Sequence, residues 1–194
     1  SSSSSSSSST STQQHEPISP EPMELRRALE NSARRVENLD PWAQGKGLVA
    51  APDAIAYARA HHGKVGQHVE FSACVPSRAR ARGVYLRDAG ELNGLLTMNV
   101  EVTPRLSHSA AGRTEEEVEE LLELEVEMAL ASGAAWVSTP ASITMMSQAR
   151  SFPVRINTEG LKPGAYFTTV TGTDASDPAR GALFSLPITV IVPV

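Results

Sequence analysis

The strongest constraint on the fold is an alternation of apolar and polar residues between positions 184 and 194. Every second residue there is large and apolar, in the order Phe184, Leu186, Ile188, Val190, Val192 and Val194. Successive side chains of a β-strand point to opposite faces of a sheet, so this period of two predicts a half-buried strand. Pro187 and Pro193 stand on the other face, which places them near a sheet edge or at the ends of the strand.

The same period recurs upstream in shorter stretches. Alternating apolar residues fill 69–75, 96–102 and 152–156, and turn-forming segments lie at 159–164 and 172–174. Strands and turns at this spacing are typical of antiparallel sandwiches. We therefore predict a mostly β chain in which residues 66–194 form an antiparallel β-sandwich of the immunoglobulin or fibronectin kind.

Residues 23–62 show a helical pattern instead. Small and apolar residues recur there at spacings of three and four, namely Leu25, Ala28, Leu29, Ser32, Ala33 and Val36. They predict an amphipathic helix with Arg26 and Arg27 on its polar face. Pro52 suits the first turn of a second helix, which should end near His61. The apolar faces of these helices need a partner that the chain does not supply, so we expect them to close a domain that lies upstream.

Residues 1–22 differ in composition from the rest of the chain. They hold a polyserine run, two glutamines and three prolines. Such a segment has too little apolar surface to offset the entropy lost on ordering. We predict a disordered linker or insertion. Because the chain begins with serine instead of methionine, we also expect it to be an internal or truncated segment.

The segment 114–131 allows two interpretations. Its glutamates and leucines favour a helix, and Thr114 with Glu117 resembles a capping box. However, the apolar residues Leu122, Leu124, Val126, Met128 and Leu130 alternate strictly with other residues. A helix would scatter them around its surface. We therefore predict a strand from about residue 121 and a solvated acidic loop at 115–120.

Charge and cysteine content exclude some classes of function. The formal net charge is -5 and the sequence pI is about 5.6, which gives no electrostatic reason to expect nucleic acid. Cys74, the one cysteine of the sequence, has no internal disulfide partner. It is expected to be a buried, inert thiol in a reducing compartment. No apolar run reaches the length that spans a bilayer. A cytoplasmic location without membrane or nucleic-acid partners is the prediction.

Individual residues give no reason to predict a catalytic, cofactor-binding or metal site. His61 and His62 are adjacent and point in different directions, unlike metal ligands, and His15 and His68 lie in low-complexity or linker segments. Trp42 and Trp136 are expected to be packing anchors, with Trp42 a candidate for seating the helices on the sandwich. Too few arginines cluster at 78–82 for a nucleic-acid surface. We expect neither cofactor nor metal.

Eight segments of the chain carry a resemblance in their order and spacing, and together they span nearly everything after Met23. They are Glu24–Ala33, Ala43–Leu48, Arg82–Asp88, Ala135–Val137, Met145–Arg150, Gly160–Leu161, Gly181–Phe184 and Pro187–Val190. In these segments the chain resembles the tripeptidyl-peptidase II family of subtilisin-like serine peptidases. The chain departs from the family pattern in its acidic tract at 113–120, its arginines at 78–82 and its polyserine run.

The resemblance implies a role for the parent protein. The family's members are expected to be cytosolic homo-oligomers that remove tripeptides from the free amino termini of peptides with an Asp, His and Ser triad. Residues 23–62 would then be the C-terminal helical tail of the catalytic domain. No Gly-Thr-Ser motif of the family's nucleophile occurs in this chain. By itself it is therefore expected to be a scaffold for the catalytic domain and for other subunits, not a peptidase.

A second hypothesis stays open. The sandwich could be a free-standing adaptor whose sheet faces or loops bind a protein partner, with the helices as an accessory. The two hypotheses differ in what they require of the helices. A segment cut from a larger enzyme leaves apolar helix surface exposed, whereas a free-standing adaptor covers that surface itself.

Overall fold

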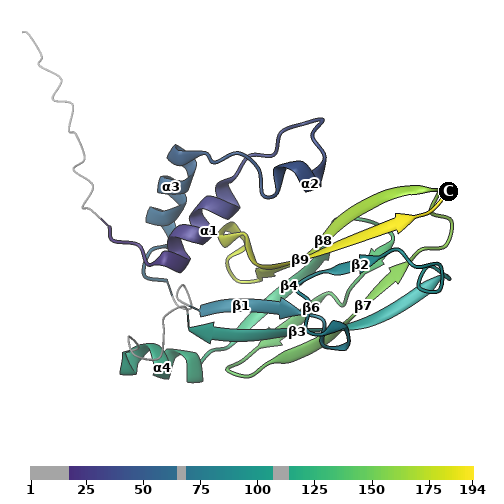
Figure 1. Ribbon diagram of the computed structural model, residues 1–194. Coiled ribbons are helices and arrows are strands. Elements are labelled where there is room, and N and C mark those ends of the chain that lie inside the picture. The colour runs from purple at the N-terminus through teal and green to yellow at the C-terminus, as the bar shows by residue number, and fades with distance from the viewer. Residues whose placement is uncertain (1–17, 65–68, 107–113) are drawn as a thin grey trace, which may run out of the picture.

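The computed structural model describes residues 18–64, 69–106 and 114–194. A helical segment (residues 18–64) lies on one side of a two-sheet sandwich (residues 69–194), as Figure 1 shows. Its helices are α1 (Pro22–Ser32), α2 (Pro41–Gln44) and α3 (Ala51–His61). A fourth helix, α4 (Glu115–Leu122), interrupts the sandwich, and short 3-10 turns lie at Pro76–Arg78 and Pro178–Arg180. The strands are β1 (Val69–Cys74), β2 (Val84–Leu86), β3 (Leu95–Leu106), β4 (Val126–Ser132), β5 (Val137–Ser138), β6 (Ser142–Met145), β7 (Arg150–Asn157), β8 (Gly164–Asp174) and β9 (Ala182–Val192).

The strands form two sheets, which confirms the predicted mostly β sandwich. One sheet has the order β1-β3-β7-β5 and the other the order β2-β9-β8-β4-β6. All pairs are antiparallel except β2 with β9, where Val84 lies opposite Ile188 in a parallel register. The predicted antiparallel sandwich thus contains one short parallel pair, which the sequence did not indicate. The chain leaves β1 through the turn at Pro76–Arg78 and joins the second sheet at its edge, where it runs alongside β9.

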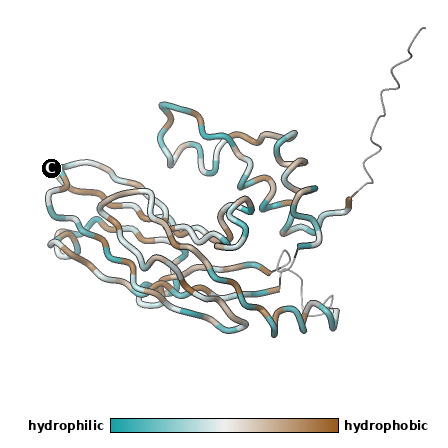
Figure 2. Tube along the Cα trace, turned by 180° about the vertical axis from the view of Figure 1, so that it is seen from behind, coloured by the Kyte–Doolittle hydropathy of each residue, from teal (hydrophilic) through white to brown (hydrophobic). Residues whose placement is uncertain are grey.

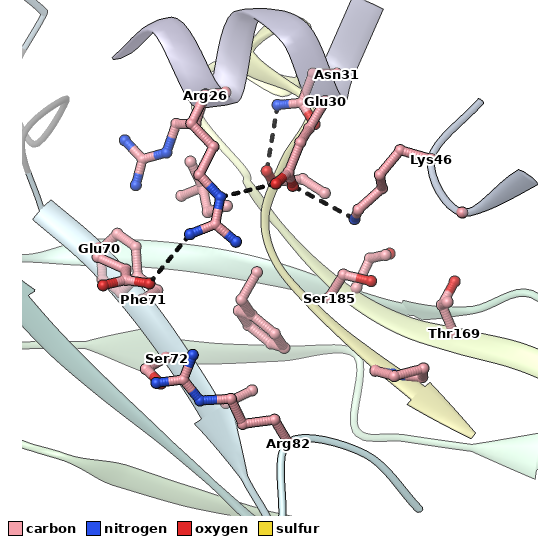
Figure 3. A pocket seen from close by; sticks show the side chains of 18 of the residues that line it. Arg26, Glu30, Asn31, Lys46, Glu70, Phe71, Ser72, Arg82, Thr169 and Ser185 are labelled. Atoms are coloured by element: carbon pink, nitrogen blue, oxygen red, sulfur yellow. Dashed lines mark hydrogen bonds and ion pairs between the residues drawn. The ribbon is translucent and has the colours of Figure 1, made fainter. Parts of the chain in front are cut away.

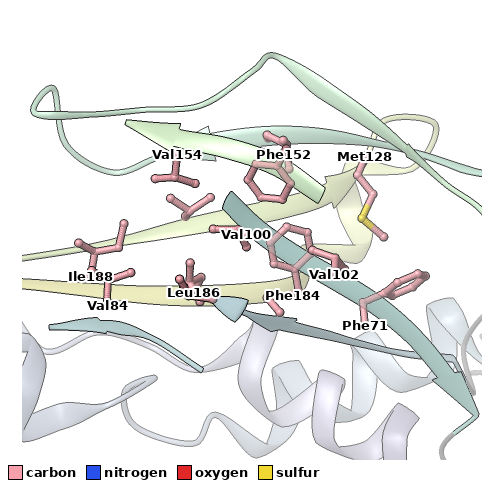
Figure 4. Packing of buried hydrophobic residues seen from close by; sticks show 14 of the residues in the cluster. Phe71, Val84, Val100, Val102, Met128, Phe152, Val154, Phe184, Leu186 and Ile188 are labelled. Atoms are coloured by element: carbon pink, nitrogen blue, oxygen red, sulfur yellow. The ribbon is translucent and has the colours of Figure 1, made fainter. Parts of the chain in front are cut away.

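The core lies between the two sheets and consists of the side chains that alternate in the sequence. Figure 2 shows hydrophobic and hydrophilic residues alternating along the strands, and Figure 4 shows the buried set. The predicted inward positions from β3, β7 and β9 are buried up to Val190 with one exception, Leu96, which is only partly buried; the buried set is Met98, Val100, Val102, Phe152, Val154, Ile156, Phe184, Leu186, Ile188 and Val190. The alternation stops being informative at the end of β9, because Val192 is only partly buried and Val194 is exposed.

Pro187 lies in a strand that has neighbours on both sides. It pairs with Thr169 of β8, but β2 begins one residue further on, opposite Ile188. The side of β9 that β2 covers further on is therefore not paired at Pro187, and a position with one unpaired side is where a strand tolerates proline. Gly83 passes close to this proline, and a Cβ on Gly83 would lie 3.1 Å from the Pro187 Cγ. Pro187 thus has a paired strand on one side only, as a residue in an edge strand does, although β9 as a whole has neighbours on both sides.

The segment 114–131 differs in structure from the sequence-based prediction. Residues Glu115–Leu122 form α4, and β4 starts only at Val126. A strand from residue 121 and a loop at 115–120 were both wrong. Leu122 is 69% exposed, whereas Leu124 is 3% exposed and reaches the core. The helix propensity of the glutamates determines the conformation as far as Leu122. From Val126 on, hydrogen bonding to β6 and β8 stabilises a strand instead.

The predicted helices are present with shifted ends. The structure describes residues 18–22 of the segment predicted to be disordered, where Ile18 packs against the helices and α1 begins at Pro22; residues 1–17 of that prediction lie outside the described residues. The helix ends at Ser32, four residues before the predicted pattern does. Its faces were also assigned wrongly, because Arg27 is 4% exposed and Leu25 is 46% exposed. The sandwich surface that faces α1 carries backbone carbonyl groups. An arginine can donate hydrogen bonds to them and a leucine cannot, so Arg27 is the residue that turns toward the sandwich.

Candidate functional site: the junction of the helical segment and the sandwich

The side chains with the most unusual environments lie where α1 and α3 meet the sandwich. Asn31 of α1 donates its Nδ2 hydrogens to the carbonyl oxygens of Arg180 (2.7 Å) and Ala182 (3.2 Å). The Tyr57 hydroxyl of α3 donates to the same Arg180 oxygen at 2.5 Å. One turn before Asn31, Arg27 donates to the carbonyl of Val69 in β1. The two helices therefore cap backbone carbonyl groups of the sandwich that would otherwise be buried without partners.

Gly181 makes this close approach possible. It has a positive φ of 67°, and a Cβ at this position would lie 2.9 Å from the Asn31 side chain. A larger residue would be strained in the left-handed region and would push α1 away from the turn. The glycine thus lets one amide group reach the carbonyl groups on both sides of it.

A buried ion pair stabilises the same turn, which joins β8 to β9. Asp174 ends β8 and Arg180 ends the following 3-10 turn, and Nη1 of the arginine lies 2.8 Å from Oδ2 of the aspartate. The residues are 6% and 5% exposed. Burial opposes ionisation of Asp174, but hydrogen bonds from the Ser176 hydroxyl and amide, with the nearby guanidinium, outweigh it and lower the pKa of Asp174. The aspartate is therefore ionised and fixes the turn that α1 and α3 contact.

Two guanidinium groups lie close together inside this junction. Burial first, and then the charge of Arg180, lowers the pKa of Arg27 to about 10. Arg27 is still a cation at neutral pH, because its pKa remains well above 7. The junction therefore holds two buried cations, of which Arg180 is paired with Asp174.

Glu24 ties the start of α1 to the end of α3. It is 7% exposed, and its carboxylate accepts hydrogen bonds from the amides of Glu21 (3.0 Å) and Gly63 (3.3 Å). His62 Nδ1 lies 3.0 Å from the same carboxylate. The first of these bonds belongs to a capping box at the N-terminus of α1. One buried side chain thus caps one helix and holds the end of the other.

His61 is the buried histidine of the junction. Its ring lies against Tyr57, with centroids 4.3 Å apart, and its Nδ1 is 3.8 Å from Oδ2 of Asp177. Lys64 donates to the same Asp177 oxygen at 2.6 Å. Burial, followed by the charge of Lys64, lowers the pKa of His61, with a smaller contribution from Arg180; the attraction of Asp177 opposes them without cancelling them. His61 is therefore neutral at pH 7.

This environment predicts a loss of stability in mild acid. The pKa of His61 lies below its usual value of 6.5 in the folded chain, so the unfolded chain takes up the proton first as the pH falls. The free energy of unfolding should therefore decrease as the pH drops through about 6.5. In His61→Phe, which keeps a ring on Tyr57 but cannot titrate, the decrease should be smaller. Urea unfolding followed by tryptophan fluorescence at several pH values tests this, and equal slopes in the two proteins would contradict it.

Trp42 connects the helical segment to the sandwich at a second point, as predicted. Its ring meets Phe167 of β8 edge to face, with centroids 5.9 Å apart, and its Nε1 lies 3.4 Å from the Thr189 hydroxyl of β9. The indole is 48% exposed. Trp136 is the second predicted anchor; it packs against the core beside Tyr166. Both tryptophans have packing contacts.

The other residues considered in the sequence lie apart from one another. Cys74 is buried and free, as predicted. Arg78 contacts Glu91, and Arg80 pairs with Glu101 at 2.7 Å. His15 and His68 lie outside the described residues. Within the described ranges, no three His, Cys, Asp or Glu side chains are grouped to hold a metal ion, and no helix is long and apolar enough to cross a membrane.

The sequence patterns did not indicate the residues of this junction. Arg27 was placed on the solvent face of its helix, and Asn31, Asp174 and Arg180 stand among ordinary helix and turn residues. One signal was available. Gly181 comes four residues after Asp174-Ala175-Ser176-Asp177, an aspartate-rich turn before a strand, and such turns are typical sites for side chains that bind backbone groups.

Comparison with known proteins identifies the family. Residues 69–191 match the family described as tripeptidyl-peptidase II, first Ig-like domain. The chain belongs to the tripeptidyl-peptidase II family. Tripeptidyl-peptidase 2 of Drosophila melanogaster is 27% identical over 172 residues, covering 89% of this chain and 12% of its own. The Arabidopsis thaliana protein is 29% identical over 183 residues, covering 91% and 13%.

The likeness extends to structure and beyond the Ig-like domain. A crystal structure of tripeptidyl peptidase 2 superposes with a TM-score of 0.79 at 26% identity, covering 91% of this chain and 14% of that one. Since these matches are longer than 69–191, they include residues of the helical segment. The chain spans about an eighth of the length of the tripeptidyl-peptidase II relatives that it matches.

Proposed function

We propose that this chain is a non-catalytic part of a serine exopeptidase that removes tripeptides from the amino termini of peptides. In this proposal residues 23–62 are the closing helices of a subtilisin-like catalytic domain, and the sandwich holds that domain and neighbouring subunits of a cytoplasmic homo-oligomer in place. Family membership and the small share of each relative that the chain covers support it.

The observation that carries the proposal is the apolar surface of the helical segment. The large apolar side chains there that are at least 46% exposed are Leu25, Leu39, Trp42, Leu48, Val49 and Ile55. Leu48 and Val49 are 64% and 66% exposed on consecutive residues. A short segment with this much exposed apolar surface needs a covering partner. A catalytic domain packed on these helices would supply it, whereas a free-standing adaptor offers no reason for the exposure.

A graft into a relative tests the scaffold role. This chain would replace the corresponding segment of the Drosophila tripeptidyl-peptidase 2, and release of tripeptides from a fluorogenic peptide and particle size would be measured. We expect the graft to retain activity. Leu48→Ser with Val49→Ser in the graft should lower both activity and particle size, because the covering contact is lost. Leu95→Ser, which removes an equally exposed leucine from β3, is the matched control and should leave both unchanged.

The chain alone gives the complementary measurement. It should release no tripeptides, and it should bind a hydrophobic dye that Leu48→Ser with Val49→Ser no longer binds. Peptidase activity in the pure chain would overturn the non-catalytic assignment. A chain that neither binds dye nor loses function in the substituted graft would favour the adaptor.

A further inference from the structure

A positively charged pocket of about 480 Å³ opens between α1, β1 and the first half of β9 (Figure 3). Five cationic side chains line it, against the two carboxylates Glu30 and Glu70: Arg26, Arg27, Arg35, Lys46 and Arg82. The pocket thus carries an excess of positive charge, although the whole chain has a net charge of -5. A local field of this sign attracts an anionic group.

Neighbouring carboxylates account for only part of this charge. Glu30 pairs with Arg26 at 2.8 Å and with Lys46 at 3.7 Å, and Glu70 lies 3.6 Å from Arg26. Arg35 and Arg82 are exposed and have no ion pair within the described residues. These two guanidinium groups are therefore available to a carboxylate from another molecule.

The remaining walls favour an amphipathic ligand over a simple ion. Leu183, Phe184, Phe71 and Phe167 supply its apolar lining, called the apolar floor below. Hydroxyl groups from the strands stand among them, for example those of Ser72 and Ser185 (Figure 3). A ligand that fits both features carries carboxylates together with aliphatic side chains.

The chain itself carries such a surface on α4. Glutamates 115, 116, 119 and 123 at this helix are exposed. Val118 and Leu122, four residues apart on one helix face, are 40% and 69% exposed. In Figure 1, α4 lies on the β3 side of the sandwich, whereas the pocket lies on the side of α1. The acidic helix and the basic pocket therefore face different directions on one molecule.

We propose that α4 of one copy of this chain docks in the basic pocket of a second copy. The glutamates meet Arg35 and Arg82, and Leu122 meets the apolar floor. The contact is head to tail, since each copy keeps a free pocket and a free helix, so it can continue from copy to copy. This inference rests on the proposed role in assembly and names the surfaces that carry it. Its charge pairs are exposed, so the contact should be weak and should weaken further with salt.

Charge reversal with rescue tests the contact. Sedimentation velocity of the purified chain at low salt should show self-association. The pocket variant Arg35→Glu with Arg82→Glu should weaken it about tenfold or more, and so should the helix variant Glu116→Lys with Glu119→Lys. A mixture of the two variants should associate again, because the reversed charges attract each other. The control Arg59→Glu with Arg87→Glu makes the same charge change on exposed arginines outside the pocket and should associate like the wild type.

Salt and a peptide separate this contact from other causes of association. High salt should dissociate the copies, whereas association through the exposed helical leucines would persist. A synthetic peptide of residues 114–125 should bind the wild-type chain and not the pocket variant. A chain that stays monomeric at low salt, a mixture without rescue, or a control as weak as the pocket variant would each overturn the proposal. None of these results changes the graft's peptidase readout, so the two proposals fail separately.

Discussion

Replacing Asp174 by alanine is expected to lower the free energy of unfolding by about 3–5 kcal/mol, because it leaves a buried cation without its counter-charge. Arg180 is 5% exposed and Asp174 is its ion-pair partner at 2.8 Å. The charge of Arg180 already acts on Arg27, so removal of the carboxylate leaves Arg180 without its ion-pair partner beside a second buried cation. The amide hydrogen bonds from Ser176 and Asp177 are lost as well.

Urea unfolding measures this effect without adding salt. Asp53→Ala is the matched control, since Asp53 forms a 2.7 Å pair with Arg34 whose side chains are 45% and 72% exposed; an exposed pair should cost no more than about 1 kcal/mol. Asp174→Asn separates charge from hydrogen bonding, because an amide oxygen can still accept from Ser176. Equal losses in Asp174→Ala and Asp53→Ala would contradict the role assigned to the buried pair.

Replacing Gly172 by alanine should be the most damaging single-methyl change in the sandwich. Gly172 of β8 lies opposite Phe184 of β9, and a Cβ on it would fall 2.1 Å from the ring's Cε1 atom. The ring is 5% exposed and sits beside Phe152, with centroids 6.2 Å apart. Since the ring must leave its packed position beside Phe152 to admit the methyl group, we expect a loss of about 1–3 kcal/mol from overpacking.

A double-mutant cycle checks this explanation. Gly90→Ala is the control, since a Cβ there meets nothing within 4 Å, and it should be neutral or slightly stabilising. Phe184→Leu removes the ring that causes the clash, so the loss from Gly172→Ala should be smaller in that background than in the wild type. If Gly172→Ala is as harmless as Gly90→Ala, or if the two losses simply add, the ring is not the obstacle.

The sandwich could be predicted from the sequence because its core obeys a single rule. A strand with one buried face must alternate, and from Phe152 to Ile156 and from Phe184 to Val190 every predicted inward residue is buried. The rule failed where two tendencies compete. At Leu122 the alternation pointed to a strand, but the surrounding glutamates formed a helix because no neighbouring strand reaches that residue.

The junction could not be predicted because its residues bind partners that are distant in the sequence. Arg27 is buried since the carbonyl of Val69 happens to face it, and Asn31 since the turn at Gly181 presents two carbonyl groups. A periodicity within one helix contains no information about such partners. The short parallel strand β2 was not predicted either, because its three residues are too few to show a period of two. Family membership is confirmed, while the subtilisin-like tail and the cytoplasmic location stay predictions.

The capped carbonyl groups of Arg180 and Ala182 also set an order of events during synthesis. Asn31 contacts residues 149 and 151 positions further along the chain, so α1 emerges from the ribosome long before its binding site exists. Contacts this remote in sequence form late and slowly. Until the turn after β8 is made, Asn31 and Tyr57 lack their partners, and the exposed apolar surface of the helices stays uncovered in this segment throughout. An upstream domain that folds first would shield that surface, and the sandwich would then dock onto helices already in position.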